Sequence, residues 1–135
     1  MVNNVLVILA SFNGEKYIQD QIFSILSQKL VSVELYIFDD CSNDKTVDII
    51  NSFNDKRIHF FQNTISSGNA ANNFLYSLTY ILKSNIDNYD YISFSDQDDI
   101  WLEYKLFNSI NSIYTKNFDL YCSNLMLRGE DNNNK

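Results

Sequence analysis

The sequence predicts an α/β fold in which a mostly parallel sheet carries helices on both faces. Two kinds of segment in the sequence predict this fold. Short apolar runs alternate along the chain with longer segments whose apolar residues recur three and four positions apart. Strands that alternate with helices of this length form parallel sheets, because each helix returns the chain across the sheet before the next strand. The 135 residues, 45% of them hydrophobic, suffice for one domain with a buried core.

The elements of the first half of the chain follow from two patterns. A strand buried on both faces reads as an uninterrupted apolar run, and a helix with one buried face shows apolar residues at helical spacing. These patterns predict a strand, a helix, a strand, a helix and a strand, at Val5–Leu9, 15–28, Val33–Phe38, Val47–Phe53 and Arg57–Phe61. We expect Ser42 or Asn43 to cap the second helix.

The second half of the chain repeats the alternation. It predicts a helix, a strand, a helix and a fifth strand, at Ala71–Leu82, Tyr89–Phe94, Leu102–Ile113 and Phe118–Cys122. The last eight residues contain no apolar side chain and are typical of a frayed tail. We therefore assign residues 1–127 to the domain, with a sheet that stops after about its fifth strand, and residues 128–135 to a polar tail.

The composition limits the classes of partner that the protein can bind. A formal charge of -7 and a pI near 4.4 argue against nucleic acid and against an anionic membrane surface, since both require clustered Lys and Arg. The sequence opens without a signal peptide and has no apolar run of the ~20 residues that a membrane span requires. We expect a cytoplasmic protein that meets a membrane only peripherally, through regions outside these residues.

Three polar segments directly follow predicted strands, at Ser11–Glu15, Asp39–Ser42 and Ser95–Asp99. In parallel sheets, ligands bind outside the carboxyl ends of the strands, where the loops leave the sheet. We therefore expect these loops to converge on one edge and to form the binding site.

The segment Asp96-Gln97-Asp98-Asp99 concentrates carboxylates that repel one another unless a cation neutralises them. Mg²⁺ or Mn²⁺ is the simplest partner, because it prefers carboxylate oxygen and shares its remaining positions with water and phosphate. Alternate residues of an extended segment point the same way, so Asp96 and Asp98 can share one ion. The alternative is that Asp98 or Asp99 caps a helix beginning near Ile100.

Other residues of the expected edge have two interpretations each. Asp39 or Asp40 would accept hydrogen bonds from a nucleobase imide or a ribose hydroxyl, or would form a turn or cap. Gly68 would allow close approach to a diphosphate, or would serve a turn. Trp101 would anchor its loop in the core, an interpretation we favour slightly, or would stack on a sugar.

Four blocks, in order, resemble the motifs of the family 2 glycosyltransferases, whose fold is the Rossmann-like GT-A sheet. VLVILASFNGE at residues 5–15 resembles the opening strand and nucleotide loop, with Ala10 where many members have Pro. Residues 39–44 resemble the DDxSxD element, and residues 63–74 resemble the stretch before the third helix. SDQDDIW at 95–101 resembles the DxD metal motif in the form common among bacterial rhamnosyltransferase-like members.

The resemblance implies roles for individual residues. Asp39 would read the uracil or thymine edge, Asp96 would approach the ribose and the metal, and Asp98 would be the principal ligand of Mg²⁺ or Mn²⁺. Asp99 and Trp101 are candidates for contact with the sugar or the acceptor. The full set of residues expected to bind the nucleotide sugar is Ala10, Ser11, Phe12, Glu15, Asp39, Gly68, Asn73, Asp96 and Gln97.

The resemblance also implies a reaction. Family members invert the anomeric centre: an acceptor hydroxyl attacks while an Asp or Glu removes its proton. That base normally lies in the second half of the domain, so we expect it beyond the end of this chain. The expected donor is a UDP- or dTDP-sugar, with dTDP-rhamnose suggested by the SDQDDIW form, and the expected acceptor is a saccharide or lipid-linked saccharide of a surface polysaccharide.

Two alternatives remain open on the sequence. A receiver-type signalling domain is also an α/β unit that binds Mg²⁺ at strand ends, although it places acidic residues after its first strand, where this chain has Ser11-Phe12-Asn13. A catalytically incomplete nucleotide-binding fragment would share every motif described above.

Overall fold

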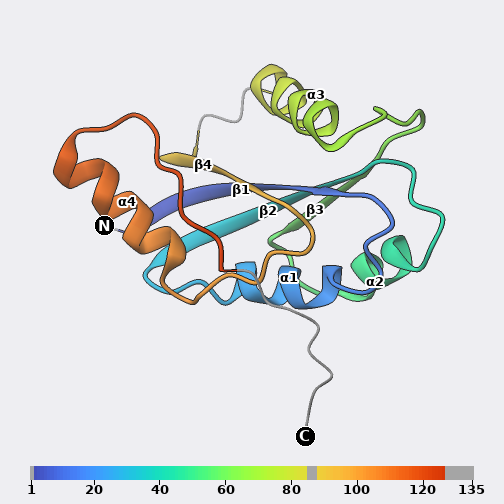
Figure 1. Cartoon of the computed structure of the whole chain (residues 1–135), viewed down its shortest axis with the longest axis horizontal. Coiled ribbons are helices and arrows are strands. Elements are labelled where there is room, and N and C mark those ends of the chain that lie inside the picture. The colour runs from blue at the N-terminus through green and yellow to red at the C-terminus, as the bar shows by residue number, and fades with distance from the viewer. Residues whose placement is uncertain (1, 85–87, 127–135) are drawn as a thin grey trace, which may run out of the picture.

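The computed structural model describes residues 2–84 and 88–126, and the polar tail predicted over 128–135 lies outside them. Within these ranges, no helix has the length and apolar character to cross a membrane. Four strands form one sheet (Figure 1). In chain order the elements are β1 (Asn3–Ser11), α1 (Ile18–Leu26), β2 (Val31–Asp39), α2 (Thr46–Ser52), β3 (Ile58–Gln62), α3 (Ala70–Lys83), β4 (Tyr91–Ser95) and α4 (Lys105–Lys116).

The sheet is parallel throughout and has the strand order β3-β2-β1-β4. This arrangement confirms the predicted α/β class with a parallel sheet. The first three strands of the receiver-type fold run in the order 2-1-3, whereas here they run 3-2-1. The receiver-type alternative is therefore wrong.

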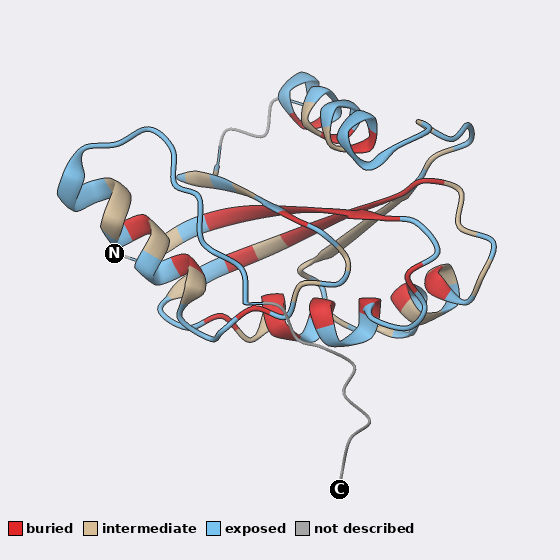
Figure 2. Ribbon diagram, in the orientation of Figure 1, coloured by how far each residue is buried: buried red, intermediate tan, exposed pale blue. Residues whose placement is uncertain are grey.

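Helices cover both faces of the sheet, because alternate residues of the central strands are apolar on each side. Val5, Val7 and Leu9 of β1 pack against α1, α2 and α4, together with Trp101. Leu6 and Ile8 face the other way, toward α3. Figure 2 shows that the buried residues concentrate in β1, β2 and the sheet-facing sides of the helices.

The predicted fifth strand, Phe118–Cys122, is wrong. These residues follow α4 as irregular chain, and Phe118 and Leu120 are 56% and 77% exposed. The backbone N–H of Phe118 donates to the carbonyl of Ile113 at 3.0 Å, which ends the helix instead of starting a strand. An apolar run becomes a strand only beside a partner strand, and no strand of the described chain lies next to this one.

The cap predicted for the second helix is also wrong, and so is the capping alternative for the acidic segment. The residue that precedes α2 is Lys45, so neither Ser42 nor Asn43 caps it. The residue that precedes α4 is Tyr104, so Asp98 and Asp99 do not cap that helix either. The carboxylates of the acidic segment are therefore free of the capping role that competed with metal binding.

The core predicts the effect of a single truncation. Ile37 of β2 is 0% exposed and belongs to the larger apolar cluster. Replacing it, as Ile37→Ala, should lower the free energy of unfolding by about 2–5 kcal/mol, since the side chain is lost and a cavity remains. Urea unfolding followed by circular dichroism measures this change. Ile65→Ala, at a side chain that is 83% exposed, should change the value by less than about 0.5 kcal/mol.

Candidate functional site: a cavity at the carboxyl edge of the sheet

The parallel register brings the ends of three strands together. Ser11 of β1 lies opposite Asp39 of β2, and Leu9 of β1 lies opposite Ser95 of β4. A cavity of about 300 Å³ opens at this edge. The predicted site residues that line it are Ala10, Ser11, Phe12, Gly68, Asn73, Asp96, Gln97 and Asp98; the residues that line it without having been assigned to the site are Asp40, Ser66, Asn69 and Ala70.

The loops that follow β1 and β2 are hydrogen-bonded to each other. The N–H groups of the first loop donate to side chains of the second, and the N–H groups of the second donate back to Asn13 and Glu15. Glu15 accepts from the backbone N–H of Lys45 at 2.9 Å and does not line the cavity. Its carboxylate therefore fixes the shape of the cavity from outside, and nucleotide contact by Glu15 stays a prediction.

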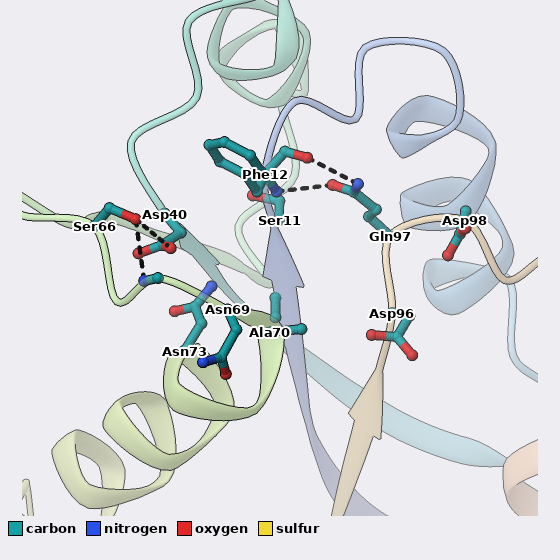
Figure 3. Close-up of a pocket in the computed structure, with 12 residues that line it drawn as sticks. Ser11, Phe12, Asp40, Ser66, Asn69, Ala70, Asn73, Asp96, Gln97 and Asp98 are labelled. Carbon is teal, nitrogen blue, oxygen red and sulfur yellow. Dashed lines mark hydrogen bonds between the residues drawn. The ribbon is translucent and has the colours of Figure 1, made fainter.

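Gln97 joins the acidic loop to the loop after β1. Its amide accepts from the N–H of Phe12 at 2.8 Å and donates to the carbonyl of Phe12 at 2.9 Å, as Figure 3 shows. A Cβ added to Gly14 would lie 2.3 Å from Oε1 of Gln97, so only glycine leaves room for this amide in its hydrogen-bonded position. Gln97 acts as a clamp between two walls of the cavity.

The neighbours of Gln97 are open to the cavity. Asp96 and Asp98 are exposed, whereas Gln97 and Asp99 are half-buried, although residues 97 and 98 form a turn and not the extended segment that was predicted. In Figure 3, the side chain of Gln97 points to Phe12, whereas the carboxylates of Asp96 and Asp98 point away from Phe12. The surrounding protein desolvates the Asp96 carboxylate and raises its pKa, and the charges of Asp99 and Asp98 raise this pKa further.

This geometry fits a divalent cation whose shell is completed by a ligand. The described residues hold no cluster of three or more His, Cys, Asp or Glu able to bind an ion by themselves. Mg²⁺ and Mn²⁺ are commonly held by one or two carboxylates together with water and phosphate oxygens. Asp96 and Asp98 are the candidates for those two carboxylates, and a cation there would offset the neighbouring negative charges that help raise the pKa of Asp96.

Asp39 and Asp40 have different surroundings although they are adjacent. Asp39 is 0% exposed and accepts from the hydroxyl of Ser11 at 3.0 Å and from the N–H of Ser42 at 2.9 Å. It lies beneath the cavity lining, whereas Asp40 is part of it. The role in base recognition that the resemblance gives to Asp39 stays a prediction.

Asp40 holds the segment between β3 and α3 against the cavity. It accepts from the side chains of Asn63, Ser66 and Ser67 at 3.0 Å each, and from the N–H of Ser67 at 2.6 Å. Burial opposes the ionisation of Asp40, but these hydrogen bonds outweigh it and lower the pKa of the carboxyl. The negative charge of Asp40 is thus matched by donors within the protein.

The N-terminus of α3 forms the wall next to Asp40. Gly68 has a φ of 87°, a left-handed conformation that favours glycine, and Asn69 caps the helix by accepting from the N–H of Asn72 at 2.9 Å. Asn73, 2% exposed, donates to the carbonyl of Phe38 at 2.9 Å and so ties the helix to β2. The first turn of a helix carries partial positive charge, which makes this wall suited to an anion.

Two predicted contacts lie away from the cavity. Trp101 is 6% exposed and packs in the larger core cluster, with the ammonium of Lys105 4.2 Å from the centre of its ring. The side chain anchors its loop, and little of its surface is available to a sugar. Asp99 is half-buried, and desolvation together with the charge of Asp98 raises its pKa, with partial compensation from Lys105.

The hydrogen bonds of Asp40 predict a pH-dependent stability. Its pKa in the folded protein lies below the ordinary value of 3.8, so its contribution is present above pH 3.8 and is lost as the pH falls through the lower folded value. Asp40→Asn should destabilise the protein by about 1–3 kcal/mol at pH 7, because the negative charge is lost and an NH₂ group replaces one of the two acceptor oxygens. Urea unfolding should show a smaller difference from wild type at pH 3.

Asp20→Asn provides the control for that measurement. Asp20 is exposed on α1 and does not line the cavity, so its replacement should change the free energy of unfolding by less than about 0.5 kcal/mol at pH 7. An Asp40→Asn deficit of equal size at pH 7 and pH 3 would contradict an ionised, hydrogen-bonded Asp40.

Known proteins are similar to this chain in sequence and in fold. RfbG of Shigella flexneri, a dTDP-rhamnosyl transferase, is 39% identical over 121 residues, which are 87% of this chain and 41% of the relative. WfaP of Escherichia coli, a UDP-Glc:alpha-D-GlcNAc-diphosphoundecaprenol beta-1,3-glucosyltransferase, is 36% identical over 112 residues, 83% of this chain and 42% of the relative. The chain thus spans less than half the length of these curated relatives.

Solved structures agree with this similarity. TarS 1-349 of S. aureus in complex with UDP has a TM-score of 0.67 at 25% identity, covering 83% of this chain and 32% of that chain. The mannosyltransferase PcManGT from Pyrobaculum calidifontis, in complex with GDP-Man and Mn²⁺, has a TM-score of 0.68 at 19% identity, covering 84% of this chain and 33% of that chain, and shows likeness of fold alone. The family model Glycosyl transferase family 2 matches residues 6–135. The chain therefore belongs to glycosyltransferase family 2.

Proposed function

We propose that this chain carries the donor and metal site of an inverting glycosyltransferase that builds a surface polysaccharide. The donor would be a UDP- or dTDP-sugar, with dTDP-rhamnose favoured by the similarity to RfbG, and the acceptor a saccharide or lipid-linked saccharide. One observation carries the proposal: the cavity places the exposed carboxylates of Asp96 and Asp98 across from the N-terminus of α3. A cation and a diphosphate would lie between these two walls.

Different residues of the cavity would bind different parts of such a donor. Gly68, Asn69 and Ala70 would lie along the diphosphate, where helix N–H groups and the partial positive charge of α3 favour anions. Asp96 and Asp98 would hold the cation. When bound, it would supply Lewis-acid stabilisation of the charge that develops on the departing nucleoside diphosphate.

The nucleoside would occupy the side of the cavity near Phe12 and Asp40. Phe12 is 52% exposed and can cover a base, while the strand ends supply polar groups for hydrogen bonding. We assign donor and metal binding to these residues and propose no general base among them.

Calorimetric titration of UDP and dTDP, with and without Mn²⁺, tests the donor site. We expect binding that Mn²⁺ strengthens, and we expect Asp98→Ala to weaken it at least roughly tenfold, because the ion loses a ligand. The tighter of the two nucleotides identifies the carrier base. Asp20→Ala, which removes an exposed carboxylate that does not line the cavity, should bind like wild type.

Two results would count against the proposal. If Asp98→Ala binds as tightly as wild type in Mn²⁺, Asp98 is not a metal ligand. If the folded wild-type chain binds neither UDP nor dTDP under any of these conditions, the cavity is not a donor site for either carrier.

A further inference from the structure

Helix α1 carries polar side chains on the face that it buries. Gln21 and Ser24 lie three positions apart on one side of α1, and Gln28, just past the end of the helix at Leu26, follows at the next four-residue step. They are 0%, 8% and 8% exposed. Burying an amide or a hydroxyl is unfavourable unless it is hydrogen-bonded, so apolar side chains would suit a purely structural contact better.

All three side chains bond to the segment that follows β4. The Gln21 amide donates to the hydroxyl of Ser95 at 2.6 Å, and Ser24 accepts from the N–H of Trp101 at 3.1 Å. Gln28 donates to the carbonyl of Leu102 at 2.8 Å and accepts from the N–H of Leu106 at 3.0 Å. Segment 95–106, which contains the acidic residues, is therefore attached at its start to α1 and at its end to Gln28, just past the end of α1.

The contact of Gln21 reaches the metal-binding segment most directly. The hydroxyl of Ser95 accepts from Gln21 and donates to the carbonyl of Asp96 at 3.0 Å, so Gln21, Ser95 and the Asp96 backbone form a chain of hydrogen bonds. The hydroxyl of Ser24 lies within hydrogen-bond distance of both the side-chain Oε1 of Gln21, at 3.0 Å, and the backbone carbonyl of Gln21, at 2.9 Å. Gln97 holds the same segment from the other side through Phe12.

We propose that Gln21, acting through Ser95, is a positioning residue that sets the Asp96 and Asp98 carboxylates for a divalent cation. The inference rests on the proposed donor and metal site. Side chains that orient metal ligands from behind typically change metal affinity when they are replaced. Without the bond from Gln21, only backbone pairing with β1 and the Gln97 bonds to Phe12 hold the start of the loop, and the two carboxylates lose part of their order before the ion binds.

The test is the Mn²⁺ dependence of nucleotide binding by the 135-residue chain. At a fixed concentration of UDP, or of dTDP if that binds more tightly, Mn²⁺ is titrated and the concentration for half-maximal binding is measured by calorimetry. Gln21→Met keeps an unbranched side chain of similar size but cannot donate to Ser95. We expect it to raise the half-maximal Mn²⁺ concentration about tenfold. Saturating Mn²⁺ should restore the wild-type nucleotide affinity.

Two further variants separate positioning from loss of stability. Ser95→Ala should raise the Mn²⁺ requirement by a similar factor, and Gln21→Met should add nothing in that background. If Gln21→Met does not fold, Ser95→Ala alone tests the inference. Ile50→Val, which removes one buried methylene in α2, lowers stability and should leave the Mn²⁺ requirement at the wild-type value.

Each contrary outcome overturns the inference in a recognisable way. An unchanged Mn²⁺ requirement in Gln21→Met or in Ser95→Ala excludes positioning by this contact. A loss of nucleotide affinity that saturating Mn²⁺ does not restore shows a general structural role instead. A wild-type chain that binds no nucleotide overturns both this inference and the proposed function, whereas wild-type binding with unaffected variants overturns the inference alone.

Discussion

The parallel pairing of β1 with strands on both its sides determines the rest of the structure. β1 pairs with β2 over nine positions and with β4 over five, and its side chains from Val5 to Ser11 are all buried. A shift of one residue would exchange the two faces of β1, so Val5, Val7 and Leu9 would leave the larger core cluster and the residues at the carboxyl edge would lose their partners. The observed register brings Ser11, Asp39 and Ser95 to one edge, where the cavity opens.

Most of the fold was predictable because the central strands can be recognised from their own residues alone. The apolar runs of β1 and β2 and the helical spacing in α3 identify these elements without knowledge of their partners. Phe118–Cys122 has the same apolar character but is irregular, because strand formation also requires a neighbouring edge. The start of α4 at Lys105, later than predicted, reflects the tertiary bonds that hold segment 95–106 along α1.

The sequence indicated which loops form the cavity better than it indicated which side chains line it. Strand ends indicated which loops converge, whereas the alternation predicted for an extended segment did not anticipate the turn at residues 97 and 98, and a shared ion for Asp96 and Asp98 stays a prediction. Which of Asp39 and Asp40 meets the cavity depends on where β2 stops, a boundary that a sequence pattern does not fix. Gln21, Ser24 and Gln28 were missed, although their signal was available: three polar residues at helical spacing within an apolar face.

The charges around the cavity explain how an acidic protein could receive an anionic diphosphate. On one side, Asp40 is matched by donors from Asn63, Ser66 and Ser67, and the first turn of α3 adds partial positive charge. On the other side, Asp96 and Asp98 repel each other and would repel phosphate. An anion alone would favour only the first wall, and a cation alone only the second. A diphosphate and a divalent cation together satisfy both walls, so each should strengthen the binding of the other.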